Sequence, residues 1–166
     1  MEQPAKKLAV GWFSFTCSED STILLTELLN TYLDGWKKLV EFRFFKALKT
    51  KNSLKDLDVA FIEGAISSES QANEVKKIRE NAKYLVAVGA CACTGAPSAS
   101  RNAFTPDDMS EKIKDYMSRF DYSDKVKKLE DVVKVDEKVE GCPMDTTAFL
   151  AVLLKYLKVF GVTKDA

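Results

Sequence analysis

The 166-residue sequence contains no histidine, so the commonest general base and zinc ligand is absent. Thiolates and carboxylates are therefore the chemically capable groups. The sequence also has no run of about 20 apolar residues and no charged-then-apolar segment at its N-terminus, which argues against membrane insertion and Sec-dependent secretion. Its 25 basic residues balance its 25 acidic residues, so the net charge favours neither a nucleic acid nor an anionic membrane as a partner. These absences predict a cytoplasmic protein.

Phosphate-binding glycine motifs are missing as well. Neither GxGxxG nor GxxxxGK[ST] follows the first apolar segment, which leaves a nucleotide-binding interpretation without its phosphate cradle. The length fits a single domain over residues 1–166 that can bury a sizeable core. No disulfide is needed for folding, and in a cytoplasmic protein cysteines more often bind metal or do chemistry than form disulfides.

The sequence has only four cysteines, and three of them directly follow strand-like segments. Cys17 ends LAVGWFSFTC, Cys91 follows YLVAVGA, and Cys142 follows VVKVDEKVEG. In an open parallel sheet the carboxyl ends of the strands form one crest, so we expect these thiols to converge. With Cys93 they make four thiolates, the usual ligand set of an iron–sulfur cluster.

Apolar and amphipathic segments alternate along the chain, which predicts a mainly parallel sheet with right-handed crossovers and helices on both faces. The expected class is an α/β fold of the flavodoxin-like type. The expected strands cover residues 7–13, 40–45, 58–65, 84–90 and 132–135, and the expected helices cover residues 21–38, 69–82, 109–120 and 145–161.

Glycine and proline surround the cysteines. Gly89 and Gly95 bracket Cys91, and glycine allows a backbone to pass close to a bulky ligand. In the GCP sequence Gly141 gives a turn, while Pro143 fixes the chain that leaves Cys142. This pattern argues against the interpretation that the cysteines serve only as small apolar side chains in the core.

Four segments, FTCSEDS, DVAFIEGAI, VGACACTGAPSASRN and VEGCPMD, resemble the small subunit of nickel–iron hydrogenases and its relative, the 20 kDa iron–sulfur subunit of complex I. The resemblance covers nearly the whole chain and is strongest to the soluble, cofactor-reducing hydrogenases. It implies one [4Fe–4S] cluster near a nickel–iron site held by a large partner subunit. It also implies that larger relatives carry a C-terminal multi-cluster extension, which we expect to be absent here.

The family's cluster ligands correspond to Ser14, Cys17, Cys91 and Cys142, so serine replaces the first cysteine. A hydroxyl is a far poorer cluster ligand than a thiolate, and Cys93 is the expected substitute. Ser14 itself, or a carboxylate such as Glu19 or Asp20, is the alternative fourth ligand. A cluster with three protein ligands is a further alternative.

By resemblance, the chain relays single electrons between the nickel–iron site and a further electron-transfer subunit, and has no catalytic centre of its own. One alternative is the equivalent subunit of a complex I-like or membrane-bound hydrogenase assembly. Another is an assembly or regulatory protein without a cluster, prompted by Ser14. The resemblance also suggests that Glu63 lies at the partner interface or on a proton path, although a strand-end carboxylate satisfied by loop amides explains Glu63 equally well.

Overall fold

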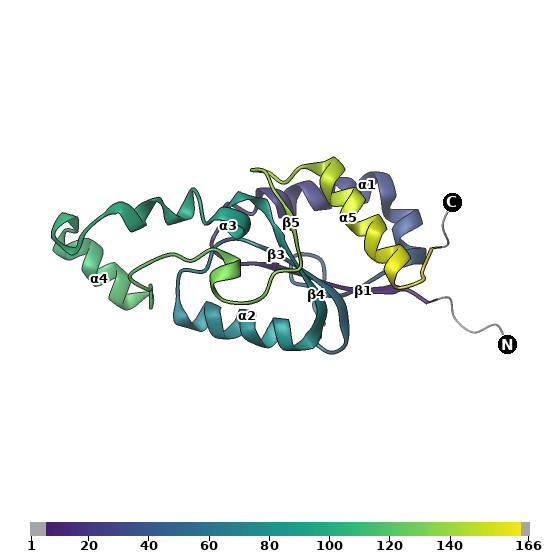
Figure 1. The fold of residues 1–166 in the computed structure, drawn as a ribbon, viewed down its shortest axis with the longest axis horizontal. Coiled ribbons are helices and arrows are strands. Elements are labelled where there is room, and N and C mark those ends of the chain that lie inside the picture. Colours follow the sequence, from purple (N-terminus) through teal and green to yellow (C-terminus); the bar gives the residue numbers. More distant parts are fainter. Residues whose placement is uncertain (1–5, 164–166) are drawn as a thin grey trace.

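A five-stranded sheet, all parallel, forms the centre of the computed structural model, which describes residues 6–163 (Figure 1). Its strand order is β2-β1-β3-β4-β5, the order of flavodoxin-like folds. The predicted fold class is therefore confirmed. The strands are β1 (Leu8–Ser14), β2 (Val40–Phe45), β3 (Leu57–Glu63), β4 (Ala82–Val88) and β5 (Glu137–Val139).

Helices cover both faces of the sheet. Helices α1 and α5 lie on one face and α2 lies on the other (Figure 1). Each covering helix turns an apolar stripe inward, so the sheet separates two hydrophobic clusters. The helices are α1 (Asp20–Leu39), α2 (Glu69–Asn81), α3 (Gly89–Thr94), α4 (Glu111–Arg119) and α5 (Thr146–Val159), with 3₁₀ turns η1 (Ser98–Ala103), η2 (Pro106–Asp108) and η3 (Leu129–Asp131).

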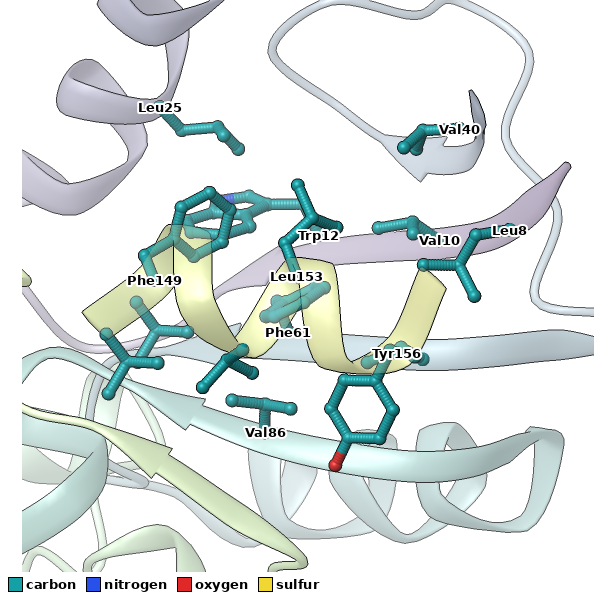
Figure 2. Close-up of a cluster of buried hydrophobic side chains, with 14 of the residues drawn as sticks. Leu8, Val10, Trp12, Leu25, Val40, Phe61, Val86, Phe149, Leu153 and Tyr156 are labelled. Carbon is teal, nitrogen blue, oxygen red and sulfur yellow. The ribbon is translucent and has the colours of Figure 1, made fainter. Parts of the chain in front are cut away.

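Aromatic side chains fill the core beneath α1 and α5. The Phe149 ring lies 5.5 Å from the Phe61 ring, 6.0 Å from Trp12 and 6.3 Å from Trp36, centroid to centroid. All three contacts are edge-on, the geometry that aromatic quadrupoles favour. Phe149 thereby joins α5 to α1 and to the two central strands (Figure 2).

The fifth strand differs from the prediction. The Val-rich segment 132–135 was expected to pair with the sheet, but β5 begins at Glu137. The backbone N–H of Asp136 donates to Leu85 O (2.9 Å), and its carboxylate accepts from Leu85 N (2.9 Å) and from Arg79 (2.6 Å). This clamp on β4 sets the start of the pairing, and the valines before it pack as partly buried side chains in the α2 cluster instead.

A second difference follows β4. Residues 89 and 90, expected to end the fourth strand, instead begin the short helix α3, which extends to Thr94. The chain then runs out to α4, which projects far from the sheet (Figure 1). None of residues 111–119, all of them described, is buried, and Phe104, Phe120 and Tyr122 nearby are 61%, 65% and 46% exposed.

Within residues 6–163, no helix combines the length and the apolar character needed to cross a membrane.

The aromatic core yields a stability prediction. Phe149→Ala should lower the free energy of unfolding of the full-length chain by about 3–5 kcal/mol, because it removes a fully buried ring and leaves a cavity. Leu154→Ala on the same helix is the matched control, because that side chain is 49% exposed, and it should cost under about 1 kcal/mol. Anaerobic urea unfolding followed by circular dichroism measures both. Equal effects would contradict the assigned core.

The Asp136 clamp yields a pH prediction. Burial acts to raise the pKa of Asp136, but the hydrogen bonds from Leu85 N and Arg79 outweigh it and hold the pKa below its ordinary value. Because the folded pKa is lower than the unfolded one, the stabilisation is present above about pH 4 and is lost as the pH falls through the folded pKa.

Asp136→Asn should therefore lower the free energy of unfolding at pH 7 by about 1–3 kcal/mol, and the gap between variant and wild type should narrow at pH 3. Urea unfolding at both pH values measures this. The control is Asp131→Asn, an exposed carboxylate nearby, which should behave as wild type at both. A constant gap for Asp136→Asn would show that its charge is not what holds the clamp.

Candidate functional site

Three of the four cysteines line one small pocket at the carboxyl ends of β1, β3, β4 and β5. The structure brings together Cys17, Cys91 and Cys142, as the strand-end rule predicts. Cys17 is partly buried, Cys91 is buried and Cys142 is exposed, so the pocket opens to the surface on the Cys142 side. The other residues that line it are Ser18, Asp20, Glu63, Val88, Gly89, Ala90 and Gly141.

Cys17 lies on the turn between β1 and α1. The turn is held against the end of β3, because Thr16 and Ala65 exchange backbone hydrogen bonds of 3.0 and 2.9 Å. Gly64 makes this approach possible. Its φ is +98°, and a Cβ there would lie 2.9 Å from the backbone of Phe15 and of Thr16. Any larger residue would therefore push the Cys17 turn away from the sheet.

Helix α3 separates the two cysteines that follow β4. Residues two apart on a helix point in directions about 200° apart. Cys91 faces the pocket, with Sγ 3.3 Å from Ser98 Oγ. Cys93 faces the α2 cluster, where Sγ lies 3.6 Å from both Ala87 O and Val139 O and the residue is 3% exposed. The structure thus does not bring Cys93 to the pocket.

Cys142 follows a turn that requires glycine. Gly141 has φ +113°, and a Cβ there would lie 2.5 Å from Pro143 O. Gly141 O accepts from Ala90 N (2.7 Å), which ties the turn to α3. The Cys142 thiol donates to Asp20 Oδ2 (3.2 Å) at the start of α1.

Glu63 ends β3 and satisfies the first amides of α1. Its carboxylate accepts from Ser21 N (2.9 Å), Thr22 N (3.1 Å) and Thr22 Oγ1 (2.7 Å), and the residue is 1% exposed. Burial raises the pKa of Glu63, and the hydrogen bonds from Thr22 and Ser21 offset only part of that rise. All these contacts lie within the chain, as expected for a carboxylate that stabilises a helix N-terminus.

Two of the alternative fourth ligands, Ser14 and Glu19, lie outside the pocket lining, whereas Asp20 is part of it. Ser14 Oγ hydrogen bonds to Thr22 Oγ1 (2.9 Å), which also accepts from Trp12 Nε1 (2.8 Å). Glu19 is exposed, and its backbone N–H, not its carboxylate, points at Cys17 Sγ (3.4 Å). Neither residue is among those that line the pocket.

The sequence analysis missed Ser21. Its Oγ accepts from Met144 N (3.1 Å) and so joins the start of α1 to the turn that carries Cys142. The residue is fully buried. A serine in the first turn of a helix is common, so nothing in the sequence distinguished this one.

The pocket favours the protonated thiols of Cys17 and Cys142 when no cation is present. Burial, followed by the charge of Glu63, raises the pKa of Cys17 to about 12. The hydrogen bond to Asp20 raises the pKa of Cys142. Burial acts to raise the pKa of Asp20, but hydrogen bonds from Cys142 and Ser21 outweigh it and lower the pKa. A bound metal reverses this balance, because coordination deprotonates a thiol outright.

The donor set suits a cluster better than a single ion. Within residues 6–163, no three cysteine or acidic side chains lie close enough to bind one metal ion. A cubane presents its irons at separate corners, so its ligands need not meet at one point. The free space is about 10 Å³, about one water molecule, so a cluster also requires the thiols to turn outward, which exposed Cys142 is free to do.

Two relatives illustrate the similarity in sequence. The chain is 32% identical over 110 residues to the NAD-reducing hydrogenase HoxS subunit delta of Cupriavidus necator, covering 57% of this chain and 53% of that protein. It is 26% identical over 166 residues to the sulfhydrogenase 2 subunit delta of Pyrococcus furiosus, covering 95% of this chain and 66% of that protein. The chain thus matches about half to two thirds of the length of these relatives.

Solved structures share the fold. A chain of an NAD⁺-reducing [NiFe]-hydrogenase in the H₂-reduced state superposes with a TM-score of 0.80 at 20% identity, covering 93% of each chain. A chain of the actinobacterial-type NiFe-hydrogenase from Ralstonia eutropha superposes with a TM-score of 0.63 at 16% identity, covering 98% of this chain and 57% of that one. At these identities the likeness concerns the fold.

A match to a family model establishes to which family the chain belongs. The model described as NADH ubiquinone oxidoreductase, 20 Kd subunit, matches residues 17–156. This span begins at Cys17 and contains both Cys91 and Cys142, so it includes the whole pocket as well as most of the sheet. The chain belongs to the family of the 20 kDa subunit of NADH ubiquinone oxidoreductase, which also takes in the hydrogenase small subunits.

Proposed function

We propose that this chain binds one [4Fe–4S] cluster and is the electron-transfer small subunit of a cytoplasmic NiFe hydrogenase. The observation that carries the proposal is the pocket in which Cys17, Cys91 and Cys142 meet from three separate strand ends. Its partners are a large subunit with the nickel–iron site and at least one further electron-transfer subunit. The named functions of the two relatives described above support this assignment.

The chain's own residues provide the binding and the placement. A bound cluster supplies one-electron transfer, with a potential set by ligand type, charge, hydrogen bonds and exposure. Cys17, Cys91 and Cys142 would hold it. Ser98 Oγ lies near Cys91 Sγ and the Glu19 amide near Cys17 Sγ, so these groups would tune the potential through hydrogen bonds to sulfur. The exposed Cys142 side would face the partner.

The placement of Glu63 favours a positioning role. Its carboxylate is buried and accepts three hydrogen bonds from Ser21 and Thr22, so we propose that it fixes the start of α1 beside the pocket. The proton-path role suggested by the resemblance stays a prediction, and it requires the partner subunit to reach this carboxylate.

A second candidate is the equivalent subunit of a complex I-like or membrane-bound hydrogenase assembly, favoured by the family description itself. The sequence of the large partner distinguishes the two, because a nickel site needs cysteine ligands that a quinone-reducing relative lacks. A chain without any cluster, acting in assembly or regulation, is the remaining alternative. It predicts a colourless protein after purification without oxygen.

The cluster proposal predicts a defined metal content. The complex purified anaerobically should contain about four irons and four sulfides attributable to this chain, with an electron paramagnetic resonance signal after dithionite reduction. Cys91→Ala should abolish both and should lower hydrogen-dependent reduction of a dye at least tenfold, because the relay is interrupted.

Ser100→Ala is the matched control. It is an exposed residue on the 3₁₀ turn that follows α3 and lies outside the pocket lining, so it should leave iron, signal and rate unchanged. An iron-free wild-type complex, or a Cys91→Ala complex with its full iron content, would overturn the proposal.

A further inference from the structure

Three thiols in the pocket leave one corner of a cubane without a thiolate ligand. Cys93 points into the α2 cluster from the opposite side of α3, and turning it round would require unwinding that helix. Ser14 is held by Thr22, and the Glu19 side chain is exposed and does not line the pocket. A different group must complete the set if the cluster has four protein ligands.

Asp20 lines the pocket together with all three thiols. It is the first residue of α1, and its two carboxylate oxygens have different partners. Oδ1 accepts from Ser21 N (2.9 Å), the ordinary role of an acidic residue in a first helical turn. Oδ2 turns instead toward Cys142 Sγ, 3.2 Å away and 122 positions later in the chain. The favourable charge of an acidic residue in the first turn of α1 accounts for the first contact and leaves the second unexplained.

Hydrogen bonds from two other elements fix the backbone next to Asp20. Glu63 holds the amides of Ser21 and Thr22, directly after Asp20. Ser21 Oγ accepts from Met144 N, and this bond keeps the Cys142 turn beside α1. The start of α1 is therefore fixed, and the Asp20 carboxylate on it is held by Ser21 N and by the Cys142 thiol. Carboxylate oxygen is a known type of metal ligand, and this one already lies within contact of a thiol that would bind the neighbouring iron.

We propose that the Asp20 carboxylate is the fourth protein ligand of the cluster, beside the thiolates of Cys17, Cys91 and Cys142. This inference rests on the proposed function, because it presupposes that the pocket holds a cubane. It replaces Cys93 with a residue whose placement needs no change in the backbone. One iron would then carry a hard oxygen ligand at the exposed side of the pocket, next to Cys142.

The test compares Asp20→Asn, Asp20→Cys, Cys93→Ala and Glu19→Gln in the anaerobically purified complex, by iron and sulfide analysis, electron paramagnetic resonance and Mössbauer spectroscopy. Asp20→Asn should remove about one iron per chain or change the spectrum of the reduced cluster. Cys93→Ala and Glu19→Gln should leave iron content and spectrum as in wild type, because neither side chain lines the pocket.

Asp20→Cys separates a ligand from a structural residue. A thiolate can bind iron but cannot replace the carboxylate oxygens at the helix start. A ligand role therefore predicts that Asp20→Cys restores about four irons with an altered potential, whereas a purely structural role predicts that it fails like Asp20→Asn. Thermal melting by circular dichroism confirms that each variant is folded.

The outcomes separate this inference from the proposed function. A wild-type complex with its full cluster and an Asp20→Asn variant with the same iron content and spectrum would overturn the role of Asp20 and leave the cluster in place. Loss of iron in Cys93→Ala, with Asp20→Asn unchanged, would do the same. A wild-type complex without iron would overturn both.

Discussion

The site depends on the hydrogen bonds that the buried carboxylate of Glu63 accepts. It accepts three hydrogen bonds at the start of α1 from a position at the end of β3. An unpaired carboxylate at this depth would cost several kcal/mol or remain protonated, and the unpaired amides of a buried helix start would be costly too. The Glu63 carboxylate and the first amides of α1 satisfy each other's hydrogen-bonding capacity. The direction in which α1 leaves the sheet, and with it the turn that carries Cys17, is set by this exchange.

Two further bonds extend this arrangement around the pocket. Ser21 Oγ accepts a hydrogen bond from Met144 N, and Gly141 O accepts one from Ala90 N. The turn after β1, helix α3 and the GCP turn are thus each bonded to a neighbour without any contact between the thiols themselves. This arrangement would suit the cluster proposed above, because hydrogen bonds of other groups position the loops and the thiol side chains are not needed for that purpose.

Much of the fold follows from the sequence, because the central strands of a parallel sheet are apolar along their whole length and the helices between them are amphipathic. The fifth strand was misplaced since Val-rich 132–135 has the higher β-propensity, yet pairing is set by the tertiary clamp at Asp136, which no local pattern reveals.

In the site, too, some features could be predicted from the sequence and others could not. The meeting of Cys17, Cys91 and Cys142 could be predicted from strand ends alone. The orientation of Cys93 depends on six residues being helical, and a segment this short with a glycine at its start gives no periodic signal. The contact between Asp20 and Cys142 connects residues 122 positions apart, and a single sequence does not show that such a pair is in contact.

That long separation has a consequence for how the protein is made. The turn at Cys17 is synthesised well before its neighbour across the pocket, the GCP turn, because 122 positions separate Asp20 from Cys142, and β4 and α3 lie between them in the sequence. Non-local contacts of this kind form late in folding. A nascent chain that lacks the GCP turn therefore presents Cys17 and Cys91 without Cys142, and the pocket forms only after this last segment has been added and folded.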